Sequence, residues 1–140
     1  MADAPEASER PEQLMAQFEV VQRELQRMDR RMAAIEQQML ETQQAAAAVE
    51  ALAQAGGPQE ALVPLGAGVH VRAQVDGAAP VLLPIGAGYS TEAPPADVAR
   101  ALQERVAAIQ QAFEAASQDA EELANAAAAI QERLSHAGMV

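Results

Sequence analysis

Leu62-Val63-Pro64-Leu65-Gly66-Ala67-Gly68-Val69 and Leu82-Leu83-Pro84-Ile85-Gly86-Ala87-Gly88-Tyr89 are two copies of one phrase, 20 residues apart in a chain of 140 residues. Glycine tolerates the positive φ angles that tight turns require. Each copy therefore predicts a β-hairpin, which turns at Gly66-Ala67-Gly68 in the first copy and at Gly86-Ala87-Gly88 in the second. The sequence on either side of the duplication has the pattern of one long helix, so a small β region is expected between two helical arms.

Alternation of apolar and polar residues supports the strands. From Val69 to Asp76 every second residue is apolar, which is the period of a half-buried strand. Further short extended runs are expected at Leu62 to Gly66, Val81 to Gly86 and Tyr89 to Thr91. Asp76-Gly77 is itself a good signal for a type I′ turn, so a meander with its tightest turn there remains the alternative to two separate hairpins.

Hairpins of this size are marginal on their own in water, and their open edges invite the addition of further strands. We therefore expect this region to be completed by strands of other chains. The apolar residues predicted to take part in that assembly are Val63, Leu65, Val69, Val71, Val75, Val81, Leu83, Ile85 and Tyr89.

Both arms have apolar residues at alternating steps of four and three, a heptad pattern that predicts a coiled-coil seam. The first seam ends before Gly56-Gly57-Pro58 and the second begins after Pro94-Pro95, which are typical helix stop and start signals. The predicted seams are Leu14, Phe18, Val21, Leu25, Met28, Met32, Ile35, Met39, Thr42, Ala46, Val49 and Ala53, and then Ala99, Leu102, Val106, Ile109, Phe113, Ala116, Ala120, Leu123, Ala127, Ile130, Leu134 and Ala137.

The predicted fold is mostly α with a small β hub. Two long antiparallel coiled-coil helices, residues 8–56 with Ser8 as N-cap and residues 94–138, are joined by two β-hairpins in residues 60–92. The whole of 1–140 is expected to form a single domain. On the helix surfaces, Glu19 with Arg23 and Arg100 with Glu104 are expected as solvated i,i+4 ion pairs.

Composition and charge exclude several classes of function. Alanine makes up a quarter of the chain and aromatic residues 2%, which is typical of long helices rather than of a globular core. The net charge is 9 − 20 = −11, and all nine basic residues are arginine. Such an acidic surface repels nucleic acid and anionic membranes, so neither is an expected partner. A high-salt habitat and a GC-rich genome explain the missing lysine equally well.

The sequence carries no pattern of a membrane span or signal peptide, and the expected location is the cytoplasm. Cysteine is absent, and we find no phosphate-binding loop, dinucleotide fingerprint or metal-ligand cluster. The two histidines, His70 and His136, are predicted at opposite ends of the arms. We therefore expect no catalytic residue, metal or cofactor, and a protein that is not an enzyme.

A long heptad helix, a doubled hairpin phrase and a second long heptad helix together resemble the α-type subunit of archaeal prefoldin. The likeness covers nearly the whole chain, and the doubled phrase is its most specific part, because the β-type subunit carries one hairpin. The resemblance implies a hexamer of two α-type and four β-type subunits, joined through their β strands. It also implies capture of unfolded polypeptides at the coil tips without ATP, and their delivery to a group II chaperonin.

Carried over by position, the resemblance places client binding at the ends of the arms. Methionine and leucine there are adaptable contacts suited to many partners. The residues so implied are Leu14, Met15, Phe18, Ile130, Leu134, Met139 and Val140. Leu14, Phe18, Ile130 and Leu134 are equally well explained as seam residues that close the coil, whereas Met15 lies off the seam. A structural scaffold that binds one dedicated partner is the alternative function.

Overall fold

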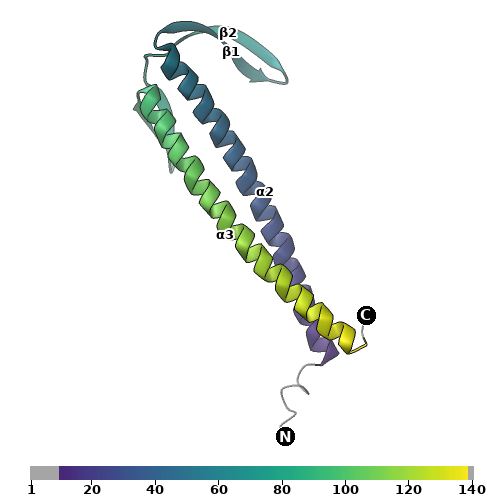
Figure 1. The fold of residues 1–140 in the computed structure, drawn as a ribbon. Coiled ribbons are helices and arrows are strands. Elements are labelled where there is room, and N and C mark those ends of the chain that lie inside the picture. Colours follow the sequence, from purple (N-terminus) through teal and green to yellow (C-terminus); the bar gives the residue numbers. More distant parts are fainter. Residues whose placement is uncertain (1–9, 139–140) are drawn as a thin grey trace. The chain divides into compact units, whose positions relative to one another are not determined.

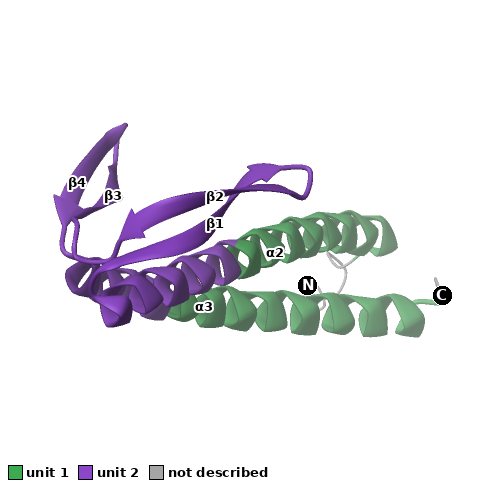
Figure 2. Cartoon of the chain, turned by 90° about the horizontal axis from the view of Figure 1, so that it is seen from above, with its two compact units in different colours: residues 1–37, 110–140 green, residues 38–109 purple. Residues whose placement is uncertain are grey.

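The computed structural model describes residues 10–138 and contains two long helices with two antiparallel β-hairpins between them (Figure 1). This arrangement confirms the predicted fold class. In chain order the elements are α2 (Pro11–Ala55), β1 (Pro58–Gly66), β2 (Val69–Asp76), β3 (Val81–Gly86), β4 (Tyr89–Ala93) and α3 (Pro95–His136). The predicted N-cap Ser8 lies outside the described residues. The chain divides into two compact units, residues 1–37 with 110–140 and residues 38–109 (Figure 2).

The predicted seams are borne out by burial. All the α2 seam residues are buried or half-buried, and so are those of α3 apart from Ala137, which is exposed. Ala137 lies beyond His136, the last residue of the helix, so the prediction is wrong at that position. The ion pair of Glu19 with Arg23 is present at 3.9 Å, whereas Arg100 pairs with Asp97 at 3.5 Å.

Each copy of the duplicated phrase forms one hairpin, as the two-hairpin prediction required. β1 pairs with β2 and β3 pairs with β4, and the described strands form these two separate sheets. The meander is therefore wrong. Ala67 and Gly68 both have positive φ angles, 52° and 79°, and their counterparts Ala87 and Gly88 have 53° and 79°. Two central residues of positive φ define the type I′ turn, whose twist matches that of the flanking strands.

Asp76-Gly77 forms a connecting turn instead of a hairpin. The Asp76 side chain accepts a hydrogen bond from the Ala78 N–H at 2.9 Å. Gly77 is buried and donates its N–H to the Gly57 carbonyl at 3.0 Å. A Cβ at residue 77 would collide with the carbonyl oxygen of Leu52 in the last turn of α2. Only glycine lets the connection between the hairpins lie this close to the helix end.

The unit of residues 38–109 has a small apolar core where the second hairpin meets the two helices. Leu83 of β3 packs there with Ala46 of α2 and with Val98 and Leu102 of α3. Val98, with 2% of its surface exposed, is the most completely buried large side chain. It lies one turn into α3, and Ala93 just before the helix packs on the same cluster, an arrangement that resembles a hydrophobic staple. The second hairpin is thereby attached to its own helices.

The other unit has a separate core at the described beginning of α2 and end of α3. Leu14 is buried against Ile130 and Leu134, and Phe18 and Val21 pack around them half-buried. The beginning of α2 and the end of α3 thus share one core, the arrangement expected of antiparallel helices.

Candidate functional site

A concentration of large exposed apolar side chains lies on the two hairpins. The register pairs Val63 with Val71, which places these two side chains on one face of the first hairpin. Toward the turn, Leu65 is 65% exposed, and in the second hairpin Tyr89 is 71% exposed. Isolated apolar groups on a surface are ordinary, but contiguous ones mark an interaction surface. Val69 and Ile85 are exposed too, and so are Leu62 and Leu82, which lie opposite Arg72 and Glu92.

The predicted assembly residues fall into three groups in the structure. Val63, Leu65, Val69, Val71, Ile85 and Tyr89 are exposed, and Val75 and Val81 are half-buried. Leu83 is 8% exposed and packs in the core of its own chain, and Val81 packs against the same core. The position of Leu83 therefore gives it an internal packing role. Leu62 and Leu82 are exposed members that sequence reasoning missed, although they are the first residues of the two duplicated phrases.

Opposite the apolar face, the first hairpin carries charged and polar side chains. Arg72 of β2 donates to the carboxylate of Glu60 in β1 at 2.7 Å. His70 lies near the turn, with its ring Nδ1 3.1 Å from the Gly68 carbonyl oxygen. The first hairpin thus has one face with Val63 and Val71, and an opposite face on which the exposed Leu62 lies directly beside Arg72.

The predicted client-binding residues also differ from one another in burial. Leu14, Ile130 and Leu134 are buried in the helix seam, Phe18 is half-buried, and Met15 is 45% exposed. Met139 and Val140 lie outside the described residues. Val20, which is 55% exposed and was missed because it lies off the seam, borders a shallow groove of about 430 Å³. The groove is lined by Ala16, Gln17, Val20, Val21 and Ile130.

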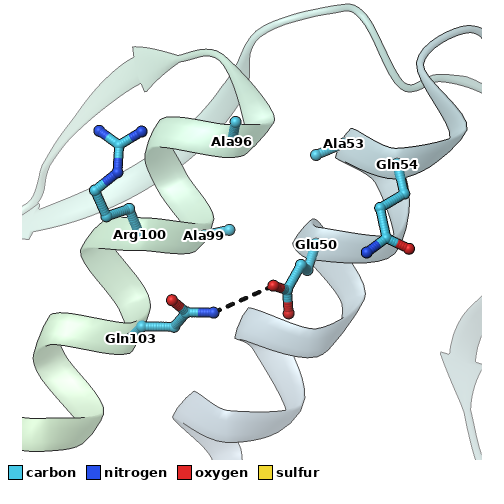
Figure 3. Close-up of a pocket in the computed structure, with 7 residues that line it drawn as sticks. All are labelled: Glu50, Ala53, Gln54, Ala96, Ala99, Arg100 and Gln103. Carbon is cyan, nitrogen blue, oxygen red and sulfur yellow. Dashed lines mark hydrogen bonds between the residues drawn. The ribbon is translucent and has the colours of Figure 1, made fainter.

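A second hollow lies between α2 and α3 close to the hairpins, and Figure 3 shows its lining. Ala53, Ala96 and Ala99 leave space between the helices, and Gln103 donates a hydrogen bond to Glu50 across it at 3.4 Å. Glu50 is the one carboxylate of the lining and accepts the hydrogen bond from Gln103, and no second acid, base or nucleophile of the lining faces it. We interpret this hollow as a polar contact between helices rather than as an active site.

Within residues 10–138, no group of three or more histidine, aspartate or glutamate side chains is placed to hold a metal ion. No helix of that region has a stretch apolar and long enough to cross a membrane.

Two long helices joined by two β-hairpins that expose large apolar side chains define the class of protein. Comparison with protein-family models matches residues 21–138 to the prefoldin subunit family, described as "Prefoldin: Prefoldin subunit". The chain belongs to the prefoldin family. Its members are chaperones rather than enzymes, and they assemble with other prefoldin subunits.

Among solved structures, the chain is similar to filamentous PFD from Methanocaldococcus jannaschii, determined by cryo-EM. The two share 21% sequence identity with a TM-score of 0.52, over 89% of this chain and 95% of that chain. At this identity the likeness establishes a shared fold. A search of curated proteins found no match to the sequence.

Proposed function

We propose that this chain is an α-type prefoldin subunit that holds unfolded polypeptides without ATP and passes them to a group II chaperonin. The observation that carries the holding function is the exposed Val20, which lines the groove together with Ile130; Met15, five residues earlier on α2, is exposed as well. A groove lined mainly by aliphatic side chains accepts many apolar segments, and an exposed methionine near the same end of the helix can repack around differently shaped partners.

For assembly we propose a hexamer in the cytoplasm, with two copies of this chain and four β-type subunits. Two hairpins per chain support the α-type assignment, since each hairpin supplies its own strands and its own exposed apolar side chains. Burial of those side chains by neighbouring subunits would contribute about 25 cal/mol for each Å² removed from water. On this proposal all of residues 1–140 work as one domain.

We propose that fewer residues are directly accessible to a client than the sequence indicated. Leu14, Ile130 and Leu134 already contact one another, so a client would have to open the helix pair to reach them fully. Met15 and Val20 are accessible without any rearrangement. Met139 and Val140 remain part of the proposal because their positions in the sequence place them after α3.

Aggregation of a chemically denatured test protein, followed by light scattering at high salt, tests the proposal. The complex should suppress scattering, and a Met15→Glu, Val20→Glu double variant should suppress it several-fold less while keeping the same native mass. Leu40→Glu is the matched control, because Leu40 is a 49% exposed apolar residue of α2 that does not line the groove. Equal suppression by both variants would contradict the proposed client site.

A second function, a scaffold that binds one dedicated partner, is favoured by how few large apolar groups the described arm ends expose. Unchanged scattering at stoichiometric excess of the complex, together with capture of a single partner, would establish the scaffold instead. Point variants separate the two functions better than a deletion of residues 1–18 and 130–140, which would also remove the seam contact between Leu14 and Leu134.

A further inference from the structure

The two hairpins share the duplicated phrase, the turn and the bulge, yet the helices hold them differently. Leu83 of the second hairpin is 8% exposed, while Val63, its counterpart 20 residues earlier, is 37% exposed. A second difference concerns the prolines that follow. The Pro84 carbonyl accepts a hydrogen bond of 2.7 Å from the Arg105 guanidinium of α3. Among the described residues, no such side-chain bond reaches the carbonyl of Pro64.

Pro84 indicates which edge of the hairpin Arg105 contacts. Proline has no N–H, so a strand accepts it where the ladder needs no donor. The N–H and the carbonyl of one residue in an antiparallel strand point to the same side, and neighbouring residues alternate. Pro84 pairs with Ser90 at a position without a donor, so its carbonyl faces away from β4. Arg105 therefore bonds the outer edge of β3.

The contact between Arg105 and β3 is supported by the packing around it. Leu83, the neighbour of Pro84, inserts into the core made with Val98 and Leu102. Leu102 and Arg105 are three residues apart on α3 and so lie on one face of that helix. Pro84 and Arg105 also line the same hollow between β3 and the helices. The hairpin is thus held by a buried leucine and by a charged hydrogen bond on one strand.

We propose that Arg105 is a positioning residue that pins the second hairpin to α3 by the outer edge of β3 and closes that edge to strand addition. At Pro84 an incoming strand finds no N–H donor, and the carbonyl there already accepts the hydrogen bond from Arg105. The second hairpin consequently offers its β4 edge to another prefoldin subunit. The first hairpin is not pinned in this way. The two hairpins therefore differ in which strand edges they offer to other subunits.

Hydrogen exchange on the full chain tests the pinning, with Arg105→Gln as the variant. Exchange of the β3 and β4 amides should become about three- to tenfold faster, the effect of losing one ordinary hydrogen bond, because the Arg105 bond is exposed to solvent. The β1 and β2 amides should be unchanged. Arg100→Gln is the matched control, since Arg100 is an exposed arginine of the same helix that pairs with Asp97. Equal exchange in wild type and Arg105→Gln, or the same acceleration in Arg100→Gln, would overturn the pinning.

Native mass spectrometry of the assembled complex tests the closed edge. Arg105→Gln frees the Pro84 carbonyl and releases β3, so species heavier than the wild-type particle should appear. The Arg100→Gln complex should keep the wild-type mass. A mass distribution that stays the same in Arg105→Gln would overturn the proposal that Arg105 closes this edge, and helical circular dichroism confirms that each variant is folded.

Discussion

Replacing Leu83 with alanine should destabilise the chain far more than the same change at its neighbour Leu82. Leu83 is 8% exposed in the core with Val98 and Leu102, while Leu82 is 65% exposed on the other side of β3. Buried leucine-to-alanine changes cost about 2–5 kcal/mol. The hollow of about 420 Å³ that Leu83 lines lets its surroundings relax, so we expect the lower part of that range, about 2–3 kcal/mol. For Leu82→Ala we expect less than about 1 kcal/mol.

Thermal unfolding of the full chain, followed by circular dichroism at 222 nm, measures the difference. At about 3 °C per kcal/mol for a chain of this length, Leu83→Ala should lower Tm by about 6–9 °C and Leu82→Ala by less than about 3 °C. The unfolding should be measured at low protein concentration, and the mass of the chain should be checked to be that of a single subunit, because assembly would cover Leu82. Equal losses for the two variants, or a loss below about 1 kcal/mol for Leu83→Ala, would refute the packing of the second hairpin on the helices.

Three further substitutions follow from local geometry. Gly77→Ala should lower the free energy of unfolding, measured by chemical denaturation, by about 1–3 kcal/mol, because the added methyl group meets the Leu52 carbonyl. Gly57→Ala is the control, because a methyl group there meets no atom within 4 Å. Ala67→Asn should raise stability by about 0.5–1 kcal/mol, because asparagine accepts the positive φ of the type I′ turn better than alanine; a loss of stability would contradict the turn assignment. Leu14→Ala should cost about 2–4 kcal/mol and Met15→Ala less than about 0.5 kcal/mol in thermal unfolding, since only Leu14 is buried, and the reverse order would contradict the seam.

The helices and hairpins were predictable because their signals are local. A heptad period identifies the inward side of a helix without knowledge of its partner, and every residue of the seam from Leu14 to Ala53 is buried or half-buried, as that period requires. Paired glycines indicated both turns. The local signal misled at Ala137, where the period continues although the helix ends at His136.

The different attachment of the two hairpins could not be predicted from the sequence. Val63 and Leu83 occupy the same place in the duplicated phrase, and only the packing of β3 on α2 and α3 separates them. Val98 was missed for a related reason, since it lies one residue off the seam and is buried by the hairpin rather than by the other helix. The sequence does hold a signal for the burial of Val98. Val98 lies one turn after the helix start at Pro94-Pro95, and Ala93 precedes that start, which is the spacing of a hydrophobic staple.

The exposure of the proposed client residues could not be predicted from the sequence either. Periodicity put Leu14 and Ile130 on the seam, but it could not decide whether the helix ends close over them. The structure buries both and leaves Met15 and Val20 accessible. Val20 had no periodic signal of its own, and only the groove beside Ile130 draws attention to it.

Native mass spectrometry of the complex purified from its own source, compared for the wild-type chain and Leu65→Asp, tests the central claim that exposed hairpin faces build the assembly. We predict a wild-type particle that contains this chain with other prefoldin subunits, in the ratio of two to four. Leu65→Asp should release the chain as a folded free subunit, because assembly would bury an unpaired charge at a position that is 65% exposed in the single chain. A wild-type chain that is free of other prefoldin subunits, or a Leu65→Asp particle of unchanged mass, would contradict the account.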